Sequence, residues 1–323
     1  MSKSTFVKPE TAIKDVLMSP TPITSTLRVP GTSGRPLPYK AIDGAFQGSF
    51  ARAVDHSLTV HDVPWYRRRE YYTKGWTDPV IWRSAVVECL ATSSMIYVSG
   101  QFGVTLMNSG TTQIVGYVGI FNAILLSSFI YATATATGGH LNPMITFMTI
   151  LCGLTPLSRG MVLILAQTLA GLVAGGVLLG SLGHDRAVSH MGGGNFFDPR
   201  VLSPGQALLT ETMSSATLLT LAIGNGLDPR QQQLYGPRIG PLLVGLSMGL
   251  VTCAGTGIAP GYTGPGLNPA RAIALAVAGY NWQNHWIWWV GPALGSIIVA
   301  AVYSFAPPDH ADHIRNKTKG SVV

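Results

Sequence analysis

The sequence predicts an all-α membrane protein with six transmembrane helices and two half-helices arranged as an inverted repeat. The composition is the first observation: 47% of residues are hydrophobic and only 11% are charged, whereas soluble domains average about 25% charged residues. The second observation is that Leu-Asn-Pro occurs twice, at 141–143 and 267–269. A duplicated motif in so apolar a chain indicates two halves of similar structure.

A lone glutamate precedes each copy of the motif within an apolar stretch. Asn142 lies 54 residues after Glu88 (142 − 88), and Asn268 lies 57 residues after Glu211 (268 − 211). The similar spacings place one repeat at 80–182 and the other at 205–306. Together they predict a membrane domain over 80–306, between an N-terminal tail, 1–79, and a C-terminal tail, 307–323.

Apolar stretches long enough to cross the bilayer occur three times in each half. A helix of roughly 20 residues crosses about 30 Å of hydrocarbon. The predicted spans are 82–105, 114–136, 160–182, 205–226, 239–258 and 286–306. Three spans per half mean that the second half enters the membrane upside down relative to the first.

Two apolar segments are too short to cross the bilayer. They follow the two motifs at 143–152 and 269–278. Each begins with Asn followed by Pro, and Pro is favoured at the first helical position because its missing N–H would have no partner there. Both segments are therefore predicted to be half-helices that approach each other from opposite faces of the membrane.

The distribution of positive charge predicts that both tails are cytoplasmic, in a membrane that we take to be the plasma membrane. Lys and Arg are more frequent on the predicted inner side (Arg159, Arg230, Arg238, Arg315, Lys317 and Lys319) than in the outer loops (Arg186 and Arg200). The tail 1–79 is basic and rich in Pro, Ser and Thr, without an apolar signal-peptide core. Its charge favours contact with anionic lipid rather than with nucleic acid.

No residue pattern predicts a cofactor, a metal site or a disulfide. Cys89, Cys152 and Cys253 are odd in number and lie in apolar runs, so we expect free thiols. The predicted outer loop 183–204 holds His184, Asp185 and His190, which we interpret as an exposed loop rather than a metal or pH-sensing site. Its Gly-Gly-Gly run at 192–194 lacks the Lys-Ser/Thr of a phosphate loop.

The two motifs resemble the signature loops of the major intrinsic protein, or aquaporin, family. The resemblance rests on Gly139-His140-Leu141-Asn142-Pro143 and on Gly266-Leu267-Asn268-Pro269-Ala270-Arg271. It extends over 80–306 and includes Val87-Glu88-Cys89-Leu90-Ala91-Thr92 and His285-Trp286-Ile287-Trp288-Trp289-Val290-Gly291-Pro292. It implies a passive channel of the bilayer, assembled as a homotetramer, and no enzymatic activity.

Asn142 and Asn268 are predicted to meet at the midplane of a pore. An Asn before a helix accepts hydrogen bonds from first-turn N–H groups, which leaves its own NH₂ free to donate to a passing molecule. Each helix start also carries roughly half a positive charge. Two such ends facing one another would repel cations and hold water oxygen-first, which interrupts a proton wire.

Three charged residues within apolar segments complete the predicted site. Arg271 must face water or polar partners, and the resemblance assigns it to the outer constriction. Glu88 and Glu211 would be costly to bury alone. By resemblance, each accepts hydrogen bonds from loop backbone and braces a half-helix; a proton relay is the alternative role.

The resemblance places the rest of the selectivity constriction at Asn122, Thr256 and Pro265, where Ala254 or Gly255 would replace Thr256 after a slip in alignment. Water-strict members have Phe and His at the first two positions, and glycerol-type members have large aromatics and an Asp after the Arg. Smaller polar residues predict a wider constriction that admits water and small uncharged solutes such as glycerol, urea or hydrogen peroxide.

The chain resembles a divergent member of the family, close to the fungal X intrinsic proteins. Met144 replaces the usual Ala of the first motif. Ala272, in contrast, stands where many of the fungal X intrinsic proteins carry Cys.

The end of the N-terminal tail predicts a gate. Tyr66, Arg67, Arg68 and Arg69 combine aromatic and basic character close to the predicted inner mouth. Two other classes of function stay open from sequence alone. One is a non-conducting membrane scaffold whose basic tail recruits partners, and the other is an intramembrane enzyme that uses Glu88, Glu211 and a histidine as acid and base.

Overall fold

A computed structural model describes residues 65–67 and 69–305. The first 64 residues of the predicted N-terminal tail, Arg68 of the proposed gate and the C-terminal tail 307–323 lie outside the described residues.

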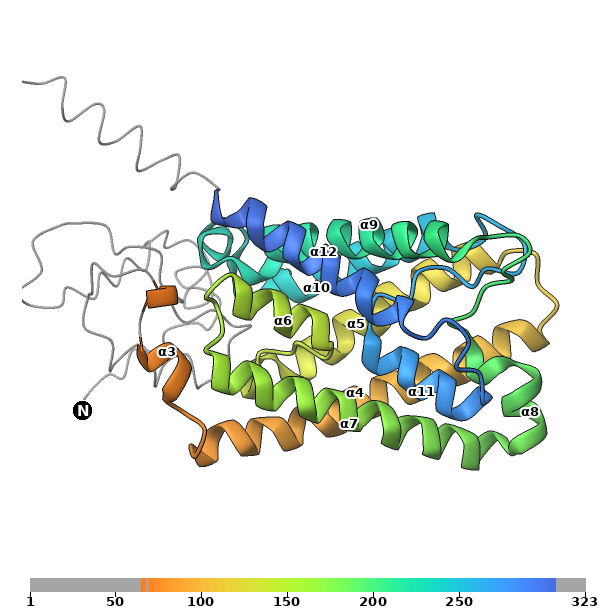
Figure 1. The fold of residues 1–323 in the computed structure, drawn as a ribbon, viewed down its shortest axis with the longest axis horizontal. Helices are drawn as coiled ribbons and strands as arrows, with labels where there is room; N and C mark the ends of the chain where they lie inside the picture. Colours follow the sequence, from red (N-terminus) through yellow and green to blue (C-terminus); the bar gives the residue numbers. More distant parts are fainter. Residues whose placement is uncertain (1–64, 68, 306–323) are drawn as a thin grey trace, which may run out of the picture. The chain divides into compact units, whose positions relative to one another are not determined.

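Long helices occupy the positions of all six predicted spans within the described chain (Figure 1). They are α4 (Pro79–Asn108), α5 (Ile114–Thr137), α7 (Leu157–Leu182), α9 (Pro204–Ala222), α10 (Pro229–Gly255) and α12 (Ile287–Ser304). By length and composition, five of the described helical stretches could cross a membrane. The thirty-residue α4 is not among them, because it carries Glu88 and several Ser, Thr and Gln residues among its apolar ones.

The fifth predicted span, 239–258, corresponds to only the apolar part of a longer helix. The chain leaves α9 through one π-helical turn, η3 (Ile223–Leu227), and begins α10 at Pro229 directly after Asp228. Pro at the first helical position is compatible with helix formation, and polar residues after it do not prevent a helix. Hydropathy alone placed the start of this helix about ten residues too late, because it registers only the apolar part of α10.

The two predicted half-helices are present as α6 (Pro143–Leu151) and α11 (Pro269–Gly279). Each begins with Pro directly after an Asn in extended conformation, as the motif predicts. Helix α6 packs against α7 and α12, and α11 packs against α7. Figure 1 shows both short helices among the longer ones.

Glycine allows the long helices to pack at close range. The main helix pairs are α5 with α10, α9 with α12, and α4 with α7. Between α5 and α10, a Cβ on Gly245 would lie 2.5 Å from the Ala123 carbonyl oxygen and would also overlap the Ser127 side chain. A Cβ on Gly249 would lie 2.6 Å from the Gly119 carbonyl oxygen. The backbones therefore approach as they do in other membrane helix pairs with small residues at the contact.

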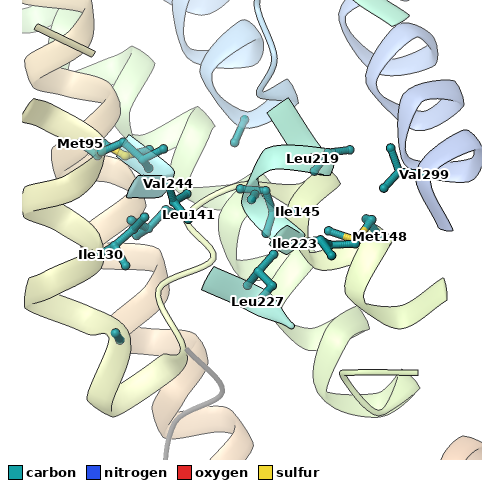
Figure 2. Close-up of a cluster of buried hydrophobic side chains, with 14 of the residues drawn as sticks. Met95, Ile130, Leu141, Ile145, Met148, Leu219, Ile223, Leu227, Val244 and Val299 are labelled. Atoms are coloured by element: carbon teal, nitrogen blue, oxygen red, sulfur yellow. The ribbon is translucent and has the colours of Figure 1, made fainter. Parts of the chain in front are cut away.

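The largest buried apolar cluster of the described residues surrounds the half-helix α6 (Figure 2). Ile145 and Met148 of α6 lie among side chains from other elements, including Leu219 of α9 and Val299 of α12. Leu141, which precedes the half-helix, is fully buried in the same cluster. This packing fixes α6 relative to the long helices, and thereby fixes the position of its first turn.

Part of the predicted tail is helical. Trp65–Arg67 form a 3₁₀ turn, η1, and Arg69–Thr73 form a short helix, α3. The predicted outer loop also contains a short helix, α8 (His184–Ser189), and a 3₁₀ turn, η2 (Met191–Gly193). All three cysteines are free thiols, as predicted.

Candidate functional site

The first turns of α6 and α11 are capped by the two motif asparagines. Asn142 Oδ1 accepts a hydrogen bond from Met144 N at 2.9 Å. Asn268 Oδ1 accepts from Ala270 N at 3.0 Å and from Arg271 N at 3.4 Å. These bonds satisfy N–H groups that a helix start leaves without partners. This part of the sequence prediction agrees with the geometry.

The amide NH₂ groups behave differently from the prediction that they are free. Asn142 Nδ2 donates to the Leu267 carbonyl oxygen at 2.8 Å, and Asn268 Nδ2 donates to the Leu141 carbonyl oxygen at 3.0 Å. Each cap is thus bonded to the opposite repeat. Because an amide nitrogen carries two hydrogens, one N–H of each Asn is engaged in this crossing and the second is available to another acceptor.

Leu141 and Leu267 adopt the same unusual backbone conformation. Their φ angles are 55° and 60°, in the left-handed region that non-glycine residues rarely occupy. The N–H of Leu141 donates to Glu88 Oε1, and the N–H of Leu267 donates to Glu211 Oε1. In each loop, the leucine N–H therefore donates to a carboxylate, and the leucine carbonyl oxygen accepts from the asparagine of the opposite repeat.

The two glutamates are fully buried and contact the loops in slightly different ways. Glu211 accepts from Gly266 N at 2.8 Å and from Leu267 N at 2.5 Å. Glu88 accepts from Leu141 N and from Gln167 Nε2, the latter at 2.9 Å. Hydrogen bonds of this kind offset the cost of burying a carboxylate. These contacts join each carboxylate to the backbone of the loop before a half-helix; the bracing role and the proton-relay alternative stay predictions.

A polar network extends the brace in the first repeat. Gln167 Nε2 also donates to Thr146 Oγ1 at 3.0 Å, and Thr146 Oγ1 lies 3.1 Å from His140 Nδ1. All of these side chains are buried. The network ties the loop before α6 to α4 and α7, so the half-helix is held by polar contacts as well as by its apolar packing.

A small cavity beside the α11 start brings together three of the predicted site residues. It is lined by Met95, Ile96, Ser99, Asn122, Leu125, Leu126, Met248, Asn268 and Arg271. Its volume, measured as the space open to the centres of water-sized molecules, is about 30 Å³. One water needs about 10–15 Å³ by this measure. The space therefore suits about two waters, between polar groups of Asn122, Asn268 and Arg271 and an apolar wall.

Arg271 is held by two side chains from other parts of the chain. Its Nε donates to Ser99 Oγ of α4 at 3.0 Å, and its Nη1 donates to Asn195 Oδ1 of the segment after η2. The sequence predicted that Arg271 must have polar partners but did not identify them. Both partners are separated from Arg271 by more than seventy residues.

The other two predicted constriction residues are not among the residues that line this cavity. Thr256 follows the end of α10 and is buried. It lies close to Gly264, because a Cβ built on Gly264 would lie 2.5 Å from Thr256 Oγ1. Pro265 packs against Gly255. Their part in a constriction stays a prediction.

The proposed gating residues are exposed where they are described. Tyr66 and Arg67 lie at the surface, with the Arg67 guanidinium 5.9 Å from the centre of the Tyr66 ring, and Arg69 is also exposed. Tyr71, which the sequence prediction missed, contacts the membrane domain. Its Oη lies 2.7 Å from the Ile150 carbonyl oxygen and 3.0 Å from that of Thr155.

The outer histidines do not form a metal centre with other described residues. Among the described side chains, no group of three His, Cys, Asp or Glu is placed to hold an ion. His184 Nδ1 lies 3.3 Å from Asp185 Oδ1, and both side chains are exposed. His190 Nδ1 lies 2.9 Å from the Arg186 carbonyl oxygen.

Comparison with known proteins identifies relatives over most of the chain. A model of the family described as major intrinsic protein matches residues 75–303. The chain is 31% identical over 254 residues to aquaporin-1 of Homo sapiens, which covers 75% of this chain and 90% of that protein. It is 30% identical over 236 residues to the probable aquaporin PIP2-6 of Oryza sativa subsp. japonica, which covers 69% of this chain and 80% of that protein.

A solved structure also has a similar fold. The X-ray structure of the aquaglyceroporin from Plasmodium falciparum matches with a TM-score of 0.57, over 69% of this chain and 95% of that chain. The sequence identity is 18%, so this likeness supports the fold.

Proposed function

Because the chain belongs to the major intrinsic protein family, we propose that it forms a passive transmembrane channel for water and small uncharged solutes and excludes protons and ions. The chain is an integral, multi-pass membrane protein. Members of the family are channels rather than enzymes. The observation that supports the proposal most directly is the reciprocal contact of Asn142 and Asn268 at the starts of two short helices.

The charges that meet at this contact support the exclusion of cations. Each helix start contributes roughly half a positive charge, and Arg271 adds a full charge beside the cavity. A cation would meet this field where few waters can accompany it. Water and neutral solutes experience no comparable barrier, and the second N–H of each asparagine can donate to their oxygen atoms.

Solute selectivity depends on the cavity beside Arg271. Asn122 and Ser99 offer small polar side chains there, while Leu125, Leu126 and Met248 supply apolar surface. A lining of this kind suits small uncharged molecules that present hydroxyl or amide groups, in the class of glycerol, urea and hydrogen peroxide. Asn122, Thr256, Pro265 and Arg271 are the proposed constriction.

The test of the channel is osmotic. Vesicles that contain the purified protein should shrink faster in a sucrose gradient than protein-free vesicles, without an energy source, and should then re-swell faster in glycerol or urea. A pH-sensitive dye inside the vesicles should report no added proton flux. If neither water nor any small solute moves faster than in protein-free vesicles, the channel proposal is wrong and the scaffold alternative takes its place.

We also propose that the segment containing Tyr66, Arg67, Arg68 and Arg69 regulates the inner mouth of the channel. The support is that α3 joins this segment to the end of α6 through Tyr71. Deletion of residues 1–70 should alter water permeability or its dependence on pH and phosphorylation. Permeability identical to that of the full chain under all these conditions would exclude a gate.

We further propose that the protein is a homotetramer in the plasma membrane, with both termini in the cytoplasm. The large apolar side chains exposed on α7 and α10, such as Leu165, Val173, Leu242 and Leu250, suit contact with lipid or with neighbouring subunits. Native mass spectrometry in detergent measures the subunit number. Protease accessibility of a tag on either terminus in sealed cells measures the orientation.

A further inference from the structure

The Gly-Gly-Gly run at 192–194 lies between α4 and α11, where a side chain on Gly192 or Gly193 would not fit. A Cβ on Gly192 would overlap the Leu275 carbonyl oxygen of α11, and a Cβ on Gly193 would overlap the Gly100 carbonyl oxygen of α4. All three glycines have positive φ angles, between 64° and 141°. The run therefore follows a path that requires both the small size and the backbone freedom of glycine.

The neighbouring helices are shaped to receive this run. A Cβ on Gly103 of α4 would overlap the Gly193 carbonyl oxygen, and a Cβ on Gly279 at the end of α11 would lie 2.7 Å from Gly192 N. Glycine on both sides of the contact brings the backbones together at a distance that other residues exclude. The segment is thus seated firmly against the two helices that carry Ser99 and Arg271.

The seated segment ends in contact with the Arg271 guanidinium. A Cβ on Gly194 would lie 3.4 Å from Arg271 Nη2, so the guanidinium packs against this glycine. The next residue, Asn195, has a φ of 60° and accepts a hydrogen bond from Arg271 Nη1 through Oδ1. The left-handed conformation is one that Asn tolerates better than most residues.

Asn195 is itself fixed on its other side. Its Nδ2 is buried, and a Cβ on Gly266 would lie 2.6 Å from that nitrogen. Gly266 is the residue whose N–H donates to Glu211. The amide of Asn195 therefore lies between the loop that Glu211 braces and the guanidinium of Arg271, with little room to rotate.

An unconstrained Arg side chain has many rotamers, and fixing it costs conformational entropy. Here Nε is held by Ser99 and Nη1 by Asn195, from two different elements. We propose that Asn195, carried by the Gly192–Gly194 segment, is a positioning residue that sets the place of the Arg271 guanidinium beside the cavity and thereby the selectivity of the channel. This inference rests on the proposed channel function.

The experiment is a double-mutant cycle with a selectivity readout. Asn195→Ala, Arg271→Ala and the double variant are reconstituted, and the ratio of glycerol to water permeability is measured for each. Asn195→Ala should shift this ratio several-fold in the wild-type background, because a guanidinium that is no longer fixed takes up other positions. In the Arg271→Ala background the same change should have no further effect.

Two more variants separate positioning from a general loss of structure. Asn195→Asp keeps an oxygen that accepts from Arg271, so it should restore the wild-type ratio. Asn284→Ala is the matched control, because Asn284 has a similar φ of 53° and lies in the segment between α11 and α12. This control should leave the ratio unchanged.

The midpoint of thermal unfolding in detergent gives a readout that does not need transport. It is measured for the wild type, Asn195→Ala, Arg271→Ala and the double variant. Positioning predicts that Asn195→Ala lowers the midpoint less in the Arg271→Ala background than in the wild type. An unshifted ratio in Asn195→Ala, or equal effects in both backgrounds, would overturn the inference. If wild-type vesicles conduct neither water nor glycerol, the channel proposal fails while the thermal cycle still decides whether the two residues are coupled.

Discussion

Arg271 shows how one side chain combines a requirement set by the sequence with partners set by the fold. A full charge in an apolar segment requires polar partners, and that requirement is visible in the sequence. Ser99 and Asn195 could not be predicted, because they come from segments 172 and 76 residues away and depend on how the helices pack.

Replacing Arg271 with Ala should widen the cavity and weaken the barrier to cations. At an effective dielectric constant of 20, unit charges 4 Å apart interact by about 4 kcal/mol, and each 1.4 kcal/mol corresponds to a tenfold change. Cation leak should therefore rise by up to about three orders of magnitude, and glycerol permeability should also rise. Vesicle swelling and cation-sensitive dyes measure both.

Lys serves as the comparison for this variant. Arg271→Lys keeps the charge but loses the fork of donors that reaches Ser99 and Asn195 together. It should keep most of the cation barrier while changing the solute ranking. An unchanged solute ranking in Arg271→Ala would remove Arg271 from the constriction.

The cap residues were predictable in part. Asn followed by Pro specifies a helix start locally, and both half-helices begin where the motif predicts. The hydrogen-bond partner of each asparagine NH₂ group was not predictable, because it is a carbonyl oxygen more than 120 residues away in the sequence. Local chemistry fixes the cap, and the inverted packing of the repeats fixes the crossing.

At the scale of elements, hydropathy located the long helices and missed their polar extensions. Helix α10 begins at Pro229 rather than near 239, and α3 lies within the predicted N-terminal tail. Both regions are polar, so they lack the hydrophobic pattern from which a helix would be predicted. In α3, the contact of Tyr71 with the end of α6 supplies a reason for order that the periodicity of the sequence does not contain.

Helix packing gives a prediction at this scale. Gly245→Ala should destabilise the protein by about 1–3 kcal/mol, because the added methyl overlaps Ser127 and Ala123 of α5 in a close-packed contact. The unfolding midpoint in detergent measures this effect.

Gly176 of α7 is the control for Gly245. A Cβ there meets no atom within 4 Å. Gly176→Ala should therefore be neutral or stabilising by up to about 1 kcal/mol, since Ala favours helix more than Gly does. Equal losses of stability in the two variants would contradict the packing argument.

The attachment of α3 gives a second prediction for an element. Tyr71→Phe removes the hydroxyl that contacts the Ile150 and Thr155 carbonyl oxygens and should cost about 0.5–1.5 kcal/mol. Hydrogen exchange of the backbone over 69–78 should accelerate. Burial also raises the pKa of Tyr71, so its hydroxyl stays protonated as the donor at neutral pH.

Tyr72→Phe is the matched control for this change. The Tyr72 hydroxyl donates to the Tyr66 carbonyl oxygen within the exposed segment. Its loss should leave the exchange of 75–78 as in the wild type. If Tyr71→Phe behaves in the same way, Tyr71 does not hold the segment on the membrane domain.

For the whole molecule, the crossing of the two asparagines joins the repeats into a single unit. Asn142→Ala and Asn268→Ala should each cost about 2 kcal/mol, from a lost cap of about 1 and a lost hydrogen bond of about 1. The double variant should cost less than the sum, by about 0.5–1.5 kcal/mol, because either change alone loosens the shared contact.

Ser203 supplies the control for this cycle. It caps α9 through a reciprocal pair of bonds with Gln206 and is exposed. Ser203→Ala combined with Asn142→Ala should give additive losses. Additivity between Asn142→Ala and Asn268→Ala as well would mean that the two halves are not coupled through their caps.

The crossing also bears on how the protein is made. The Asn142 amide and the Leu141 carbonyl find their partners only after another 125 to 127 residues have been synthesised. At about 5–20 residues per second, this takes on the order of ten seconds. During that interval the first loop must be sheltered by the insertion machinery or by water. A nascent chain that stops between the halves leaves these groups without their partners.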